Sequence, residues 1–145
     1  MIDGVRVEPL KKFEDERGMV LHMLRAENPL FERFGEIYFS YVNPGFVKGW
    51  KQHLEMTQHF CVPVGNLRLV LFDDRPDSPT RGEVQTIEMG LDHYCLVKIP
   101  PQVLYSFSAV GEQPAMIANC ADMPHRPDES VTRPLDDKEI PYQWT

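Results

Sequence analysis

Side chains that can bind ligands or move protons are concentrated in residues 49–60, which read GWKQHLEMTQHF. Four of them carry titratable groups: Lys51, His53, Glu55 and His59. Because side chains alternate along a β-strand, Lys51, His53 and Glu55 would share one face of a strand here. If that face lines a cavity, partial desolvation lowers the pKa of a lysine toward neutrality and makes it a usable base. If the face meets solvent, Lys51 and Glu55 form a surface pair; both interpretations stay open.

The same stretch allows a metal interpretation. His53, Glu55 and His59 follow an H-x-E-x-x-x-H spacing, and imidazole and carboxylate groups bind zinc, iron or manganese. A fourth ligand should come from the strand around residues 105–107, which contains no histidine. We therefore predict no metal cofactor, with a metal centre as the alternative.

The elements that must position these groups are mostly β-strands. Apolar residues alternate with polar ones in six segments: EIYFSYV (36–42), HFCVPV (59–64), LRLVLF (67–72), EVQTIEM (83–89), HYCLVKI (93–99) and AMIANC (115–120). In the first of these, Ile37, Phe39 and Tyr41 share a face. Turn sequences separate the segments, as is typical of a β-sandwich or barrel. One short helix is predicted over residues 28–35, where Asn28 caps, Pro29 fits the first turn and Gly35 ends it.

Length and charge narrow the class of protein. The 145 residues fit a single domain, and the formal net charge of −7 comes without a cluster of basic residues, which argues against a nucleic-acid partner. No apolar run reaches the roughly 20 residues of a membrane helix, and the N-terminus lacks an apolar signal region. The three cysteines lie in apolar runs and are odd in number, which predicts buried, reduced thiols in a cytoplasmic protein.

Five segments together resemble one known family. They are FEDERG (13–18), KGW (48–50), DDRPDSPTRG (73–82), IPP (99–101) and EIPYQW (139–144), and their order is similar to that in the dTDP-4-dehydrorhamnose 3,5-epimerases. The resemblance spans residues 13–144. It implies a single jelly-roll β-barrel of the cupin kind over residues 1–145, with one or two short helices. It also implies a homodimer and a nucleotide-sugar substrate handled without a cofactor.

The resemblance assigns roles to residues of the predicted site. Epimerising a carbon next to a ketone needs a base, a donor that stabilises the enolate, and an acid for the other face. Lys51 stands at the position of the family's base, Tyr105 at that of its second histidine, and Ala118 at that of its tyrosine acid. The catalytic candidates are therefore Lys51 or His53 as base and Tyr105 as donor.

Substrate-binding residues follow from the same resemblance. Arg17 would reach a nucleotide phosphate in the partner subunit, although it could also only pair with Asp15 in a turn. Lys48 replaces an arginine that meets phosphate, Phe13 would pack against a base, and Glu55 would complete the polar face. A carboxylate near residues 136–137 would orient the base or pair with the lysine at position 51.

Three functions follow from these residues. The first is an epimerase or isomerase of a 4-keto-6-deoxy nucleotide sugar in deoxysugar or cell-surface polysaccharide biosynthesis, with the family's histidine and tyrosine replaced. The second is a catalytically inactive barrel that binds a nucleotide sugar. The third is a metal-dependent cupin.

Overall fold

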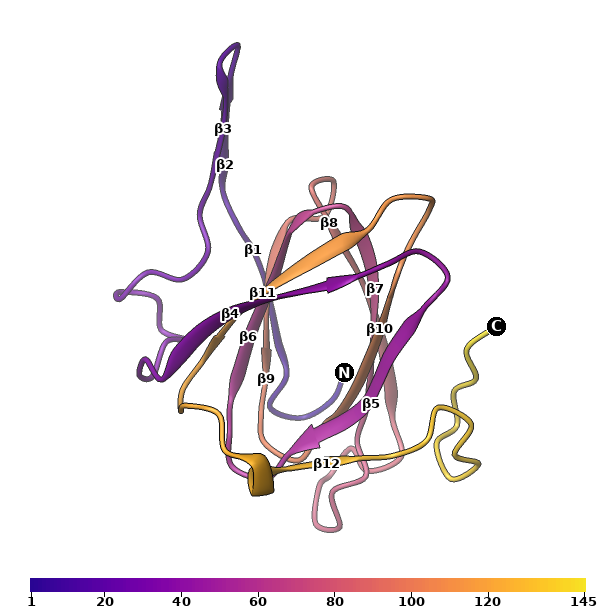
Figure 1. Ribbon diagram of the computed structural model, residues 1–145. Coiled ribbons are helices and arrows are strands. Elements are labelled where there is room, and N and C mark those ends of the chain that lie inside the picture. Colours follow the sequence, from indigo (N-terminus) through magenta and orange to yellow (C-terminus); the bar gives the residue numbers. More distant parts are fainter.

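The computed structural model describes residues 1–145 as twelve β-strands and one 3-10 helix (Figure 1). The elements are β1 (Arg6–Pro9), β2 (Lys12–Asp15), β3 (Gly18–Leu21), β4 (Glu36–Val42), β5 (Val47–His53), β6 (Gln58–Val64), β7 (Asn66–Phe72), β8 (Val84–Gly90), β9 (Cys95–Ile99), β10 (Leu104–Ala109), β11 (Ala115–Ala121), η1 (Pro127–Glu129) and β12 (Ser130–Thr132). Each of the six segments predicted from alternation contains most of one of these strands, so the predicted β architecture is confirmed.

Two five-stranded antiparallel sheets form the barrel. The first has the order β1-β9-β6-β11-β4 and the second the order β12-β5-β10-β7-β8. The largest core cluster has 18 buried residues, most of them from the two sheets, including Leu67, Leu69 and Leu71 of β7 and Phe60 and Val62 of β6. Burying alternate residues of each strand between two sheets is what the period-two pattern predicts.

Strand β4 turns its more apolar face outward and its more polar face toward the barrel interior. Ile37, Phe39 and Tyr41 do share a face, but they are 49%, 60% and 56% exposed. Tyr38 and Ser40 face the barrel interior instead, where they line a cavity. The edge strand of the first sheet therefore presents aromatic side chains on its outer face and hydroxyl groups on its inner face.

The C-terminal segment covers the outer face of the second sheet. Trp50 packs there in a cluster with Val70, Phe72, Leu104 and Ile140. The indole Nε1 of Trp144 donates a hydrogen bond to Ser106 Oγ at 2.9 Å and holds the segment in place. Because this packing turns Trp50 outward, the alternating residues Lys51 and His53 turn into the barrel.

The helix predicted over residues 28–35 does not form. Asn28 instead closes a turn: its Oδ1 accepts the backbone N–H of Leu30 at 2.9 Å, and its carbonyl accepts that of Phe31 at 2.9 Å. The Leu30 carbonyl lies 3.1 Å from His59 Nε2 and accepts a hydrogen bond from Lys98 Nζ at 3.0 Å, so it is committed to tertiary contacts. A segment of two turns has little helical stability of its own to oppose them.

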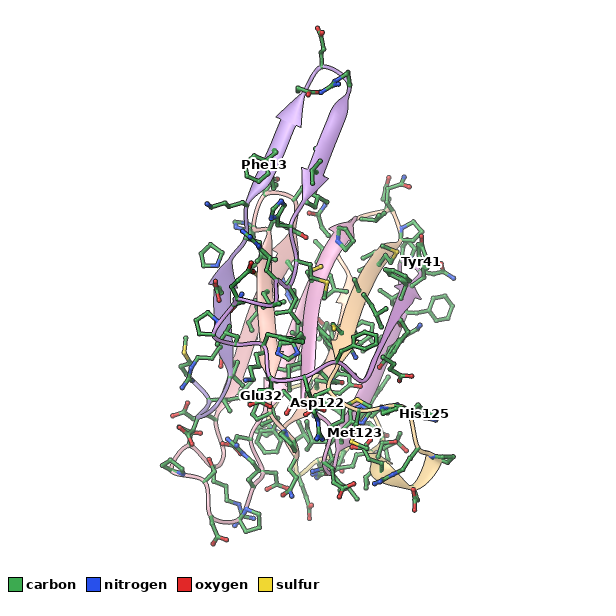
Figure 2. All side chains as sticks on the ribbon, turned by 90° about the vertical axis from the view of Figure 1, so that its left-hand side faces the viewer. Phe13, Glu32, Tyr41, Asp122, Met123 and His125 are labelled. Carbon is green, nitrogen blue, oxygen red and sulfur yellow. The ribbon has the colours of Figure 1, made fainter.

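Strands β2 and β3 form a separate two-stranded hairpin that projects from the barrel (Figure 1). Phe13 lies on this hairpin and is 53% exposed, so it does not belong to the core (Figure 2). Arg17 lies in the connecting turn, and its Nη2 is 2.7 Å from Asp15 Oδ2. Both residues thus lie on an element separate from the barrel.

Cys61, Cys95 and Cys120 are all buried and form no disulfide, as predicted. None of the helical segments has the length and apolar character needed to cross a bilayer.

Candidate functional site

A cavity of about 180 Å³ opens inside the barrel between the two sheets. The first sheet contributes the lining residues Tyr38, Ser40, Phe60, Ile117 and Asn119, and the second contributes Lys48, Gly49, Lys51, Tyr105 and Phe107. The cavity combines aromatic surface with a few hydroxyl, amide and ammonium groups. Sites for small polar ligands have this composition.

Gly49 allows the two strands that carry the polar groups to approach closely. Tyr105 of β10 stands opposite Lys51 of β5, and the register shifts by one residue just beyond this pair. A Cβ atom at position 49 would lie 2.6 Å from Ser106 Cβ, and Gly49 also has a φ of +124°. Only glycine fits both conditions, so this residue holds Lys51 and Tyr105 side by side.

His53 and Glu129 form a buried pair at the end of β5. The Nδ1 atom of His53 lies 2.6 Å from Glu129 Oε1, and the two residues are 4% and 1% exposed. Their proximity follows from the pairing of β12 with β5, which sets Ser130 opposite His53. The other carboxylate oxygen, Oε2, accepts the backbone N–H groups of Glu55 and Met56 at 3.0 and 2.9 Å.

The environment keeps His53 neutral and Glu129 ionised. Burial lowers the pKa of His53, although Glu129 opposes this shift. Burial alone would raise the pKa of Glu129, but the hydrogen bonds from His53 and the two backbone N–H groups outweigh it and lower that pKa. A neutral imidazole that donates its Nδ1–H to Glu129 leaves Nε2 with a free lone pair.

Tyr105 connects this nitrogen to the cavity. Its Oη lies 3.4 Å from His53 Nε2, and Tyr105 lines the cavity whereas His53 does not. Phe60 packs edge-on against the Tyr105 ring at a centroid distance of 5.6 Å, and Phe107 stacks on it at 6.4 Å. Burial raises the pKa of Tyr105, so its hydroxyl holds its proton at neutral pH. Glu129, His53 and Tyr105 thus form a chain along which a proton can move.

The predicted site residues occupy different places. Lys51 and Tyr105 line the cavity together with Lys48, whose Nζ donates to Ser40 Oγ at 3.2 Å. His53 reaches the cavity through Tyr105, while Phe13 and Arg17 lie on the projecting hairpin. Lys51 forms no ion pair, so the alternative interpretation, a surface pair with Glu55, is wrong.

Glu55 and His59 do not join the site because residues 49–60 are not one strand. A loop over residues 54–57 separates β5 from β6, and Glu129 anchors it through the backbone. Glu55 is exposed and pairs with Arg126. The ring of His59 meets the Leu30 and Cys120 carbonyls instead of the cavity. The three residues of the metal interpretation therefore do not converge, and no other group of three such side chains does.

The sequence missed four residues at or beside the cavity. The carboxylate that pairs with the histidine is Glu129, not Asp136 or Asp137; the latter pairs with Arg133 at 2.8 Å on the outer side of the sheet. Tyr38 and Asn119, which line the cavity, were also not identified from the sequence. Ala118, at the position of the family's tyrosine, packs with Cys61 and Tyr94 away from the cavity.

The fourth missed residue is Gln58, the first residue of β6. It is 1% exposed, and neither polar atom of its side chain has a hydrogen-bond partner. Alternation along β6 turns it toward the interior with Phe60. Its neighbours in the sequence, Thr57 and His59, are also polar, so the sequence gave no signal of this burial.

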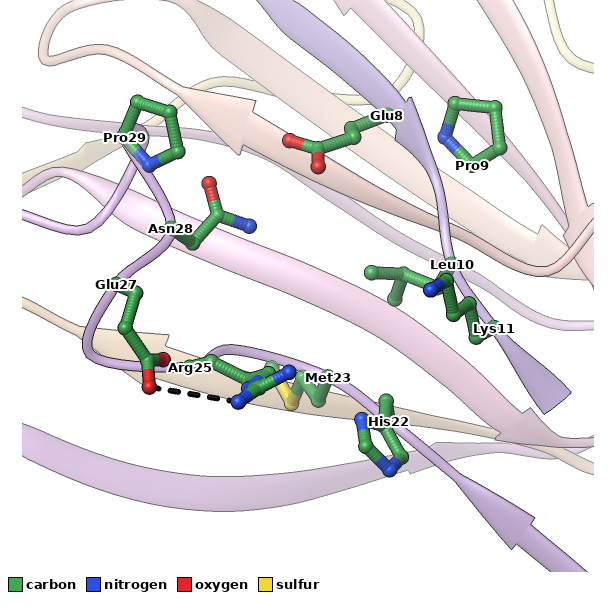
Figure 3. A pocket seen from close by; sticks show the side chains of 10 residues that line it. All are labelled: Glu8, Pro9, Leu10, Lys11, His22, Met23, Arg25, Glu27, Asn28 and Pro29. Atoms are coloured by element: carbon green, nitrogen blue, oxygen red, sulfur yellow. Dashed lines mark hydrogen bonds and ion pairs between the residues drawn. The ribbon is translucent and has the colours of Figure 1, made fainter. Parts of the chain in front are cut away.

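A larger pocket of about 370 Å³ lies outside the barrel, between the end of β1 and residues 22–29 (Figure 3). Its lining includes Lys11, His22 and Arg25, and Arg25 pairs with Glu27 at 3.4 Å. These side chains belong to mostly exposed segments and include no buried acid–base pair. The interior cavity is therefore the candidate functional site.

Two antiparallel sheets that enclose an interior polar site define a cupin-like jelly-roll barrel. Comparison with known proteins gives the family: the family model described as dTDP-4-dehydrorhamnose 3,5-epimerase matches residues 1–145. The chain belongs to this family, whose members are sugar epimerases and isomerases.

Individual relatives agree with this assignment. A spore coat polysaccharide biosynthesis protein of Bacillus subtilis is 35% identical over 146 residues, covering 99% of this chain and 97% of the relative. A probable low-salt glycan biosynthesis epimerase of Haloferax volcanii is 34% identical over 120 residues, covering 81% and 77%. The crystal structure of a dTDP sugar isomerase from Desulfovibrio desulfuricans is 49% identical and superposes with a TM-score of 0.96, covering 99% of this chain and 92% of that one.

Proposed function

We propose that the protein is an epimerase or isomerase that removes and returns a proton next to the keto group of a 4-keto-6-deoxy nucleotide sugar. The observation that carries this proposal is the chain from Glu129 through His53 to Tyr105, which ends at the cavity wall with distances of 2.6 and 3.4 Å. Family membership supports the substrate class. The relatives in spore coat polysaccharide and glycan biosynthesis support a role in polysaccharide biosynthesis.

Proton removal uses the chain of hydrogen bonds. Tyr105 Oη takes the substrate proton while its own hydroxyl proton passes to His53 Nε2, so that a C–H bond breaks and an N–H bond forms. The resulting imidazolium is stabilised by Glu129, which is already ionised. The electron pair of the broken C–H bond moves into the enolate, whose oxygen becomes negative. General acid–base catalysis of this kind contributes about 10²–10⁴-fold to a rate.

Lys51 stabilises the enolate in this proposal and does not act as the base. It lines the cavity opposite Tyr105 and forms no ion pair in the protein, so its ammonium group is available to a substrate oxygen. Loss of one such electrostatic donor typically costs about 10²–10³-fold in rate. The variant Lys51→Ala should therefore lose most proton exchange and keep nucleotide binding.

The sugar and the nucleotide occupy different places. A cavity of about 180 Å³ is smaller than pockets for drug-sized ligands, which run roughly 300–1,000 Å³, so it takes the sugar ring and leaves the nucleotide outside. Lys48 is an exposed cation on this cavity and suits a phosphate. We assign no substrate contact to Glu55, which lies outside.

A homodimer would bring the hairpin residues to the site. Phe13 and Arg17 belong to the β2–β3 hairpin, which projects away from its own barrel, so they can contact a bound nucleotide only in a neighbouring subunit (Figure 1). The exposed aromatic face of β4, formed by Ile37, Phe39 and Tyr41, supports such an assembly. The buried, unpaired cysteines fit a reducing cytoplasm.

A catalytically inactive nucleotide-sugar-binding barrel is the second candidate. It is favoured by Lys51 at the position of the family's base, and by Ala118, which stands at the position of its tyrosine and faces away from the cavity. This alternative predicts binding without proton exchange.

Deuterium incorporation from heavy water, measured by mass spectrometry over a panel of 4-keto-6-deoxy nucleotide sugars, distinguishes the two candidates. The proposal predicts deuterium at a carbon next to the keto group of at least one substrate. Measurable binding of these sugars without any incorporation would favour the inactive barrel.

A further inference from the structure

A second tyrosine faces the cavity from the other sheet. Tyr38 lies on β4 of the first sheet, whereas Tyr105 lies on β10 of the second, and both line the cavity. A sugar ring held between the sheets would have one phenol on each side. Epimerisation needs this arrangement, because the proton must return on the face opposite to the one it left.

Asn119 fixes the hydrogen bonding of Tyr38. The two residues are cross-strand partners on β11 and β4. The Oδ1 atom of Asn119 accepts the backbone N–H of His59 at 3.2 Å, so its Nδ2 faces Tyr38 and donates to the phenol oxygen at 2.9 Å. The Tyr38 oxygen is thus an acceptor within the protein, and its hydroxyl proton has no protein acceptor. That proton is free to be donated into the cavity.

The surroundings of Tyr38 suit a group that donates a proton and recovers it. Burial raises the pKa of Tyr38 more than the hydrogen bond from Asn119 lowers it, so the phenol is protonated at neutral pH. The same hydrogen bond stabilises the phenolate left after donation. Tyr38 is 37% exposed, so water can protonate it again after each turnover.

We propose that Tyr38 is the acid that delivers a proton to the substrate carbon on the face opposite Tyr105, with Asn119 as its positioning residue. The inference rests on the proposed function. The Tyr38 O–H bond breaks, the enolate electron pair forms the new C–H bond, and the carbonyl is restored. Tyr38 then takes a proton from water, and His53 returns its extra proton through Tyr105 to solvent.

The test separates proton removal from inversion. Wild type and Tyr38→Phe are incubated with an exchanging 4-keto nucleotide sugar in heavy water, and NMR measures deuterium incorporation and configuration at the exchanged carbon. The expected result for Tyr38→Phe is a loss of inverted product of about 100-fold or more, with deuterium still entering the substrate with retained configuration. Tyr142→Phe is the control, since it removes a tyrosine hydroxyl from the C-terminal segment, which packs on the outer face of the second sheet away from the cavity.

A second variant tests the positioning role. Asn119→Asp keeps the acceptor for the His59 N–H group and replaces only the donor to Tyr38, so it should lower the ratio of inversion to retained exchange while the thermal unfolding profile stays cooperative. Unchanged inversion in Tyr38→Phe, or a parallel loss of inversion and exchange, would overturn the role of Tyr38 and leave the proposed function standing. No exchange in the wild type would overturn both.

Discussion

Asp73 and Glu129 are both buried carboxylates, but they differ in whether their hydrogen-bond partners keep a group free to accept a proton. Asp73 is 0% exposed and accepts from Arg75 Nε at 2.8 Å and from the hydroxyls of Ser78 and Thr80 at 2.6 Å each. Burial alone would raise its pKa, but these hydrogen bonds outweigh it and lower that pKa. Every partner is either permanently charged or fully engaged, so the cluster stabilises a turn and offers nothing to a ligand.

Glu129 is equally buried, yet its side-chain partner is the titratable ring of His53. His53 uses one nitrogen for Glu129 and directs the other to Tyr105 at the cavity wall. Burial is thus common to both carboxylates and does not identify a functional site. The free lone pair on His53 does, because it can accept a proton that a substrate releases.

The largest expected effect is on proton exchange in His53→Asn. An asparagine can still donate to Glu129 but cannot take up a proton, so exchange should fall about 10²–10⁴-fold. Deuterium incorporation at saturating substrate measures it. Exchange within a few-fold of wild type would place the base elsewhere, with Lys51 the next candidate.

Asp73→Asn should affect stability and leave exchange unchanged. Breaking a buried charged pair leaves the Arg75 cation without its partner and costs about 3–5 kcal/mol. Urea unfolding measures the loss, and Asp77→Asn is the control, because Asp77 is exposed in the same turn. A loss of exchange in the folded Asp73→Asn protein would contradict the separation of the two regions.

The pH dependence of stability should carry a contribution from His53. Because its folded-state pKa is lowered, the unfolded chain binds the proton first. The contribution is fully present above the unfolded pKa of about 6.5 and is lost as the pH falls toward the folded value. Unfolding free energies measured from about pH 7.5 to 5.5 should thus decline more in wild type than in His53→Asn. A smaller decline in wild type would mean that His53 gains its proton on folding.

The smallest effect is expected for Gln58→Met. The buried amide of Gln58 has no hydrogen-bond partner, in contrast to the saturated Asp73 cluster, so replacing it with an apolar side chain should stabilise the protein by about 1 kcal/mol. Gln52→Met is the control, since Gln52 bonds the Gln102 carbonyl at an exposed position. Destabilisation in Gln58→Met would show that the amide is satisfied in solution.

Sequence alternation was enough to predict six of the twelve strands and the shared face of Lys51 and His53, but it left open whether that face meets the cavity or solvent. It failed where loops decide the geometry. The loop over residues 54–57 removes Glu55 from the shared face, and Glu129 lies 76 residues from His53 in a segment without periodicity. The β pairing of β12 with β5 that joins them depends on the whole barrel.

Hydrophobicity also gave no indication of Tyr38. In EIYFSYV the more apolar set is Ile37, Phe39 and Tyr41, and a strand with one solvated face would normally bury that set. The barrel instead exposes it and turns Tyr38 inward. Such an inversion is not visible in the sequence, because burial of that face depends on surfaces outside the barrel.

The central claim is that His53 is neutral at pH 7, with its proton on Nδ1 and its Nε2 open to Tyr105. Nitrogen-15 NMR of the histidine side chains reports this tautomer directly, with His53→Asn used to assign the signal. We predict a neutral Nδ1–H ring at pH 7 that becomes an imidazolium only at a pH below the usual histidine range. A His53 imidazolium at pH 7, or a neutral ring protonated on Nε2, would contradict the account.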